Sequence, residues 1–289
     1  MRYVVVSPVR NEAEFIEKTI RSMIQQTIKP MEWVIVNDGS SDETAEIVAR
    51  YAKEHPWIKL VNREDRGTRQ RGKGVVETFY KGHETLTLPY DFIVKLDGDL
   101  SFGPTYFESL GRRFASNPKL GIGGGGVYEK LDGQNWVLED PSRGHVRGPT
   151  KVYRRACFEA IGGLVPALGW DGVDEWKALT LGWEVQSFPE LKVFHYRITG
   201  AATGSLKSRI EQGDGAYYMG YHPLFLIARG VQYIFMRPCL IGGIAMIIAY
   251  FTAGLRGRER LPDPAVIRYV RRTQLKKLLG LWAKKSAHR

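Results

Sequence analysis

The chain has few cysteines, and its apolar runs lie at or below the lower length limit of a membrane span. Among 289 residues only Cys157 and Cys239 are cysteines, which excludes a disulfide framework and a cysteine-rich zinc site. The opening segment MRYVVVSPVRNE has too short an apolar run for a secretory signal, so we expect a cytosolic main domain. The remaining composition, with 43% hydrophobic and 25% charged residues, is typical of a folded protein.

Positive charge is concentrated near the C-terminus. Residues 256–289 contain eleven lysines or arginines against two acidic residues, a net charge of +9, so the first 255 residues carry only +2 of the total of +11. A basic segment of this kind favours a polyanion such as nucleic acid or an anionic lipid surface.

The segment before the basic residues favours the lipid surface. Residues 239–255 contain no charged side chain, and 223–235 contain only Arg229. Seventeen uncharged residues are at the lower edge of a membrane span, and Pro238 favours a bent helix over a straight one. We expect a peripheral or monotopic segment at the cytoplasmic face of the cell membrane and no nucleic-acid partner. The alternative is a buried core helix.

The N-terminal half alternates short apolar runs with segments of helical character. Such alternation predicts an α/β fold, a mostly parallel sheet with helices on both faces. Asn11 and Ser40 each precede an expected helix by a capping distance, with Glu14 and Glu43 three residues further on. The expected strands are 2–6, 32–37, 58–62 and 92–96, and the expected helices are 13–25, 44–55, 74–86 and 104–117.

The pattern changes after residue 118. Gly123–Gly126 have no helical or strand preference of their own, and we expect residues 129–147 to form an irregular loop. Helices at 154–164 and 174–183 and a strand at 185–197 follow. We therefore divide the chain into a catalytic domain, 1–222, with halves 1–118 and 119–222, and a membrane-associated segment of apolar helices and basic residues, 223–289.

Two carboxylates follow the strand at 92–96. Asp97 and Asp99 stand in the sequence LDGD, at the carboxyl end of a strand, where ligands bind in open α/β sheets. Side chains two residues apart in an extended segment point the same way. Two facing carboxylates suit a divalent ion, Mg²⁺ or Mn²⁺, that is completed by substrate phosphates.

Four motifs occur in order along the chain: SPVRNE after the first strand, VIVNDGSSDET at the second, LDGD after the fourth, and GWDGVDEWKALTLGW downstream. Together they resemble the family 2 inverting glycosyltransferases, nucleotide-diphospho-sugar transferases with the Rossmann-like GT-A fold. The resemblance covers roughly residues 2–200.

The resemblance assigns roles in the donor half. It implies that Asp38 binds the base of the donor nucleotide and that Pro8 and Asn11 belong to a loop lining the nucleotide pocket. It further implies that Asp97 faces the ribose and the metal sphere and that Asp99 ligates the metal. One of four basic residues after the third strand would reach the nucleotide, with Arg71 the best spaced among Arg66, Arg69, Arg71 and Lys73.

The family also needs a carboxylate base in the acceptor half, usually written Glu-Asp. Counting back from Gly182 aligns Asp171 with that aspartate, but Trp170 stands where the glutamate is usual. Asp174 and Glu175 therefore remain alternatives. Trp170 can stack on an acceptor sugar or pack in the core. His195 lies near the end of the last expected strand and is a further candidate for the metal or pyrophosphate site.

The predicted function is an inverting, metal-dependent transfer of a sugar from a nucleotide diphosphate sugar to a lipid-linked or nascent glycan at a membrane. The region LKSRIEQGDGAYYMGYHPL lacks the Gln-x-x-Arg-Trp signature of processive synthases, which favours single-sugar addition. Two alternatives are a sugar nucleotidyltransferase of similar fold and a non-enzymatic adaptor for membranes or polyanions. The first would open with a glycine-rich basic loop, which SPVRNE is not, and carboxylates at strand ends speak against the second.

Overall fold

The computed structural model describes residues 1–67, 72–130, 134–141, 143–197, 205–234 and 241–280. The chain forms two compact units, one of Met1–Pro166 with Trp170–Ile198 and one of Ala167–Gly169 with Thr199–Arg289. This division falls earlier than the domain boundary we expected at residue 222, because helix α7 (Ser205–Tyr218) packs against helix α9 (Ile241–Leu255). The extent of the catalytic domain as a functional unit stays a prediction.

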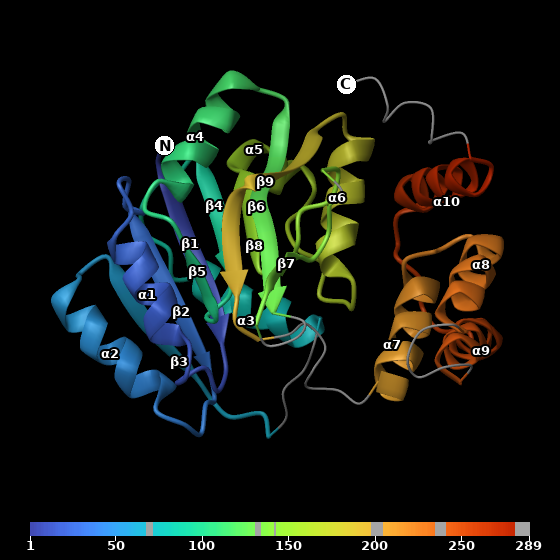
Figure 1. Ribbon diagram of the computed structural model, residues 1–289, viewed down its shortest axis with the longest axis horizontal. Helices are drawn as coiled ribbons and strands as arrows, with labels where there is room; N and C mark the ends of the chain where they lie inside the picture. The colour runs from blue at the N-terminus through green and yellow to red at the C-terminus, as the bar shows by residue number, and fades with distance from the viewer. Residues whose placement is uncertain (68–71, 131–133, 142, 198–204, 235–240, 281–289) are drawn as a thin grey trace. The chain divides into compact units, whose positions relative to one another are not determined.

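The described part of the first unit contains one mixed sheet in the order β3-β2-β1-β4-β8-β6-β9-β5, with β7 paired to β6 (Figure 1). The first four strands are parallel, as expected. Strand β8 is antiparallel to β4 and β6, and β5 is antiparallel to β9. The strands are β1 (Tyr3–Val9), β2 (Glu32–Asp38), β3 (Ile58–Arg63), β4 (Phe92–Leu96), β5 (Leu100–Phe102), β6 (Leu120–Lys130), β7 (Trp136–Leu138), β8 (Thr150–Arg154) and β9 (Glu184–His195).

Helices cover both faces of this sheet. Successive strand residues point to opposite faces, so Val5 packs in one core and Val4 in the other. The core with Val5 is closed by α1 (Ile16–Ile24), α2 (Thr44–Glu54) and α4 (Tyr106–Ser116). The core with Val4 is closed by α3 (Lys73–His83), α5 (Arg155–Ala160) and α6 (Trp170–Thr180). The α/β prediction is confirmed.

The glycine run, which has no strand preference of its own, forms the middle of the eleven-residue strand β6 (Leu120–Lys130). A Cβ atom at Gly124 would lie 2.7 Å from the carbonyl oxygen of Thr150, and one at Gly125 would lie 2.2 Å from that of Leu191. The neighbouring backbones approach so closely that only glycine fits. Strand β7 also lies inside the expected loop at 129–147.

Both predicted helix caps are wrong. Helix α1 begins at Ile16 and α2 at Thr44, and neither has a side-chain cap. Asn11 adopts a left-handed conformation with φ of 54°. Its backbone N–H donates to Ser40 Oγ at 3.0 Å, while its own Oδ1 accepts from the N–H of Ser41 at 2.8 Å. The two polar side chains join the loops after β1 and β2 instead of capping helices.

The second unit consists of helices: α7, α8 (Pro223–Ile234), α9 and α10 (Pro264–Leu278). Gly230 and Gly243 bring α8 and α9 into backbone contact, because a Cβ on Gly243 would lie 2.1 Å from the Gly230 oxygen. Their apolar core contains Ala216, Tyr217, Leu226, Met246, Tyr250 and Ala253. Among the helices of the described residues, none has the length and apolar character to cross a membrane.

The close approach at β6 predicts a stability effect. We expect Gly125→Ala to lower the free energy of unfolding by about 1–3 kcal/mol, the usual cost of overpacking a core. Gly103→Ala is the matched control, because a Cβ there meets no atom within 4 Å. Denaturant unfolding of both variants is the measurement. Equal stability of the two would contradict the tight packing of β6 against β8 and β9.

Candidate active site

Carboxylates collect where the parallel strands of the sheet end. Asp38 is the last residue of β2, and Asp97 follows the last residue of β4. Strand β1 lies between these two strands and ends in the loop that contains Asn11. The carboxyl ends of parallel strands are the edge where ligands bind in such sheets, so the topology brings the predicted donor residues to one edge.

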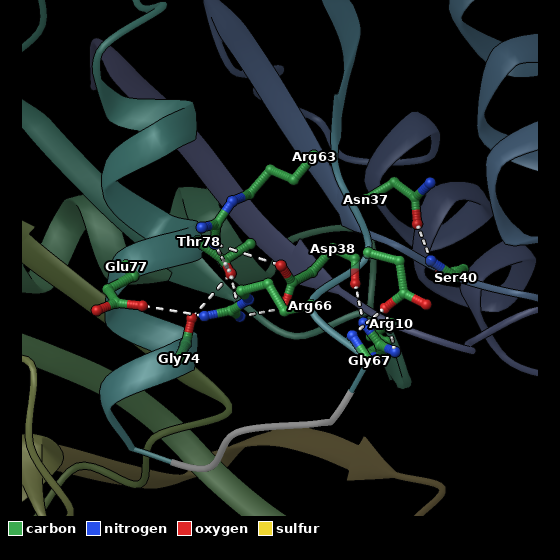
Figure 2. A network of polar contacts seen from close by, with 11 residues as sticks. Arg10, Asn37, Asp38, Ser40, Arg63, Arg66, Gly67, Gly74, Glu77 and Thr78 are labelled. Carbon is green, nitrogen blue, oxygen red and sulfur yellow. Dashed lines mark hydrogen bonds and ion pairs between the residues drawn. The ribbon is translucent and has the colours of Figure 1, made fainter.

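Asp38 is held by Arg63, the last residue of β3, and by Arg66 in the segment that follows, as Figure 2 shows. Its Oδ2 accepts a hydrogen bond from Arg66, and Arg63 Nη1 lies 3.3 Å from its Oδ1. That second oxygen is buried and has no hydrogen bond within the described part of the chain. A buried acceptor without a donor is costly, so Oδ1 is available to an N–H or O–H group of a ligand.

The loops around Asp38 are fixed by a third arginine. Arg10 donates to the backbone oxygen of Asp38 and to Asp65 Oδ1, the latter at 2.7 Å. Gly39 has φ of 68°, and a Cβ there would lie 2.5 Å from the Cα of Asp65. Pro8 does not belong to the loop, as we expected, because β1 continues to Val9 and Pro8 lies within it, opposite Val36 of β2. The loops after β1, β2 and β3 therefore form one connected rim.

The predicted phosphate-reaching residue, Arg71, lies outside the described residues, as does Arg69. Of the other two basic candidates, Arg66 is engaged by Asp38 and by Glu77 Oε2 at 3.0 Å. Lys73 lies 3.6 Å from Glu77. Both thus have acidic partners within the protein.

Asp97 and Asp99 have different partners. Asp97 accepts from the buried Lys95, whose ammonium also donates to the Gly148 oxygen at 2.9 Å. Burial and the neighbouring charge of Asp99 raise the pKa of Asp97, against the attraction of Lys95. Burial also opposes ionisation of Asp99, but the hydrogen bond and charge of His195 keep the pKa of Asp99 below its usual value.

His195 lies between two carboxylates. Its Nε2 is 3.3 Å from Asp99 Oδ2, and its Nδ1 is 2.8 Å from Glu129 Oε1. Although burial opposes its charge, these contacts raise the pKa of His195 to about 10. A protonated imidazole donates from both nitrogens and has no lone pair for a metal. Its predicted role as a metal ligand would require Nε2 to exchange Asp99 for the ion, and stays a prediction.

The donor set suits an open site for a hard divalent ion. Such an ion takes one or two protein carboxylates and completes its coordination with phosphates and water. Asp97, whose side chain is 28% exposed, and the adjacent Asp99 meet that requirement. In the ranges that the structure describes, no three His, Cys, Asp or Glu side chains form a closed metal site. The residues fit an ion that a nucleotide diphosphate would complete.

The three candidate bases differ in burial and partners. Asp174 is fully buried and accepts from Tyr153 and from Lys151 Nζ, which lies 2.9 Å from each of its oxygens. Burial, against the attraction of Lys151, raises the pKa of Asp174 to about 6. Glu175 accepts from the N–H of Val146 and contacts His145 Nδ1 at 2.7 Å.

Asp171 is the half-buried member of this group and lies in the first turn of α6. The expected helix at 174–183 begins four residues earlier, at Trp170, which is buried in the core. Asp171 Oδ2 would lie 3.1 Å from a Cβ on Gly148. The Gly148 oxygen accepts from Lys95, which pairs with Asp97. Gly148 therefore lies between Asp171 and Lys95.

Sequence reasoning missed Lys95, Lys151 and Glu129. Lys95 stands inside the apolar strand FIVKL and Lys151 inside the strand TKVYR, and both are buried. Lysine is almost never fully buried unless it is paired. The charged residue within the short apolar run FIVKL was therefore an available signal for Lys95, whereas the polar neighbours of Lys151 gave none. The partner of His195 had no such signal, because Glu129 is brought to it by the pairing of β6 with β9.

Known proteins share both the sequence pattern and the fold. The model of Glycosyl transferase family 2 matches residues 4–168. The chain is 31% identical over 104 residues to a cholesterol galactosyltransferase of Borreliella burgdorferi, covering 36% of this chain and 26% of the relative. It is 31% identical over 111 residues to a poly-beta-1,6-N-acetyl-D-glucosamine synthase of Staphylococcus epidermidis, covering 38% and 25%. The match thus spans about a quarter of each relative's length.

A solved structure gives the same fold at low identity. The mannosyltransferase PcManGT from Pyrobaculum calidifontis, solved with GDP-Man and Mn²⁺, has a TM-score of 0.56 and 17% identity, covering 99% of this chain and 84% of its own. This likeness concerns the fold. The family match covers more than half of the chain and includes the carboxylates at the ends of β2 and β4. The chain therefore belongs to glycosyl transferase family 2 and is a transferase.

Proposed function

We propose that this protein transfers a sugar from a nucleotide diphosphate sugar to a lipid-linked or nascent glycan acceptor, with inversion, at the cytoplasmic face of a membrane. The observation that carries the proposal is the position of Gly148. Its oxygen accepts from Lys95, the partner of Asp97, and its Cα faces the carboxylate of Asp171. Gly148 thus lies between Asp171, the half-buried carboxylate of the acceptor half, and Lys95, which pairs with Asp97 at the sugar-donor edge.

Donor recognition follows from the strand ends. The Oδ1 atom of Asp38 accepts from the base of the nucleotide, because it is buried and otherwise without a hydrogen bond among the described residues. Pro8, near the end of β1, and Asn11, in the loop that follows, line the same pocket. Asp97 and Asp99 hold a divalent ion, Mg²⁺ or Mn²⁺, which when bound offsets the charge of the pyrophosphate leaving group. The Mn²⁺ in the PcManGT structure supports that choice of ion.

Asp171 is the proposed general base. An inverting transfer needs one group to take the proton of the acceptor hydroxyl as the sugar moves. Asp174 and Glu175 are occupied by Lys151 and, for Glu175, by the N–H of Val146. Their lone pairs are used inside the protein, and this supports the half-buried Asp171 as the acceptor of the proton.

The second unit is the proposed membrane attachment. Helices α8 and α9 have exposed aliphatic and aromatic side chains, although none of the helices described spans a membrane. An amphipathic surface of this kind lies in the plane of the interface, with basic residues at the headgroups. The exposed apolar residues are Leu224, Ile227 and Val231 on α8 and Ile241, Ile244, Ile248, Phe251 and Leu255 on α9.

The proposed reaction is tested by incubating the protein with a panel of nucleotide sugars, Mn²⁺ or Mg²⁺, and a membrane extract. Released nucleoside diphosphate is measured for each donor. We expect release above the acceptor-free background with one donor class. Uniform background release across the panel, with folded protein and both ions, would contradict the proposal.

The carboxylate pair predicts metal dependence. We expect Asp99→Ala to reduce turnover to background, because the variant loses an ion ligand, and a thermal melt checks that the variant still folds. Excess chelator should have the same effect on the unsubstituted protein, with recovery on adding Mn²⁺. Asp91→Ala is a control, since this exposed aspartate pairs with Arg2 and lies away from the site. Full turnover in excess chelator would rule out the metal.

The base assignment predicts that Asp171→Asn lowers kcat by ~10²–10⁴, the usual contribution of a general base. Donor affinity, measured by calorimetry, should be nearly unchanged. Asp174→Asn should instead lower the free energy of unfolding by about 3–5 kcal/mol, the usual cost of breaking a buried ion pair. An unaffected kcat in Asp171→Asn together with a stable but inactive Asp174→Asn would move the base to Asp174.

The exposed apolar face predicts membrane binding. We expect Ile244→Ser, Ile248→Ser and Phe251→Ser, combined in one protein, to reduce co-sedimentation with lipid vesicles at least tenfold, because burial of each apolar side chain contributes about 1.5–3 kcal/mol. Turnover of a water-soluble acceptor should be unchanged. Loss of both activities together would indicate that the face supports folding rather than membrane contact.

A further inference from the structure

Two arginines of the second unit converge on one tyrosine. Arg229 of α8 donates from Nε and Nη2 to the hydroxyl of Tyr233, at 3.2 and 3.1 Å. Arg209 of α7 stacks on the ring of the same tyrosine, with its Cζ 3.8 Å from the ring centroid. All three side chains are half-buried. Two positive charges therefore share one aromatic side chain at a partly solvated position.

Hydrogen-bond donors exceed acceptors around this tyrosine. Each guanidinium has five N–H donors, and a neutral Tyr233 hydroxyl adds one O–H donor while its oxygen accepts from Arg229. Arg209 donates to Gln212 Oε1 at 3.0 Å, and Arg229 also forms a hydrogen bond with Tyr221. Within the described residues no carboxylate lies within ion-pair distance of Arg209 or Arg229, whereas Arg258 of the same unit is paired with Asp214 at 2.8 Å.

The local electric potential is positive. Burial alone would raise the pKa of Tyr233, but the charges of Arg229 and Arg209 lower it. Two guanidinium groups around one ring repel each other, and the repulsion grows with burial because the effective dielectric constant falls. An anion bound between them would remove that cost.

We propose that Arg209, Arg229 and Tyr233 form a binding site for the phosphate group of an anionic lipid. Guanidinium groups match phosphate oxygens in bidentate geometry, and the hydroxyl proton of Tyr233 supplies a further donor. The lipid is favoured over a soluble phosphate because α8 also carries the exposed Leu224, Ile227 and Val231 on its other side. A helix with its side chains is only about 10–12 Å across, so the proposed phosphate site lies about that far from these apolar side chains.

This inference rests on the proposed membrane attachment and gives it a specific headgroup contact. Arg209 and Arg229 are long side chains that can extend toward headgroups while their stems stay on apolar surface. The remaining basic residues of the unit, such as Arg268 and Arg272 on α10, are exposed and would act through general attraction to an anionic surface.

The test measures binding of the full chain to vesicles of phosphatidylglycerol and of phosphatidylcholine. Tyr233→Phe keeps the net charge and removes one donor, and we expect a three- to tenfold loss of affinity for phosphatidylglycerol vesicles only. Arg209→Gln combined with Arg229→Gln should lose at least thirtyfold. Tyr269→Phe, and Arg268→Gln combined with Arg272→Gln, are matched controls on α10. Thermal melts identify any variant that fails to fold.

Three outcomes would overturn the site. The first is Tyr233→Phe at wild-type affinity with equal losses in the two double arginine variants, which would indicate general charge attraction. The second is millimolar binding of inorganic phosphate, abolished by Arg229→Gln, with no preference for phosphatidylglycerol, which would make a soluble phosphate the ligand. The third is absence of vesicle binding by the unsubstituted protein, which would remove the membrane proposal as well, whereas the first two would leave it standing.

Discussion

Two buried lysines constrain the whole active site. Lys95 and Lys151 are directly opposite each other on the antiparallel strands β4 and β8, and both are almost completely buried. Like charges opposite each other on one face of a sheet destabilise it, and a buried charge requires a partner. Each lysine therefore has its own carboxylate partners: Asp97 for Lys95, and Asp174 with Glu175 for Lys151.

This pairing links the donor and acceptor halves mechanically. Lys151 also donates to the backbone oxygen of Asp171, and the ring of Trp170 lies 5.3 Å from the ammonium of Lys95 and 5.7 Å from that of Lys151. The start of α6 is thus attached to β8 and to β4, the strand that ends next to Asp97, a proposed metal ligand. A catalytic geometry fixed by packed and paired residues needs little reorganisation when substrate binds.

Polar pairing also organises the nucleotide edge and the helical unit, with opposite results. At Asp38 the arginines face a carboxylate whose Oδ1 lies 3.3 Å from Arg63 but has no hydrogen bond among the described residues, so this oxygen can accept from a further donor. At Tyr233 two arginines face a phenol without a carboxylate among the described residues, so the site lacks an acceptor. The first suits the N–H groups of a nucleobase and the second suits an anion.

The sequence by itself determined the parallel half of the sheet, because β1 to β4 are apolar, β-branched runs whose local preference agrees with their place in the fold. It also predicted that Asp38, Asp97 and Asp99 lie at strand ends, since a strand end followed by a carboxylate is a local pattern. Only the tertiary structure decided that Gly123–Gly126 form a strand, because the close approach of β8 and β9 and not local preference selects glycine there. The difference between Asp171 and Asp174 was likewise invisible in sequence, since it depends on a lysine from β8 that lies more than twenty residues away from Asp174 along the chain.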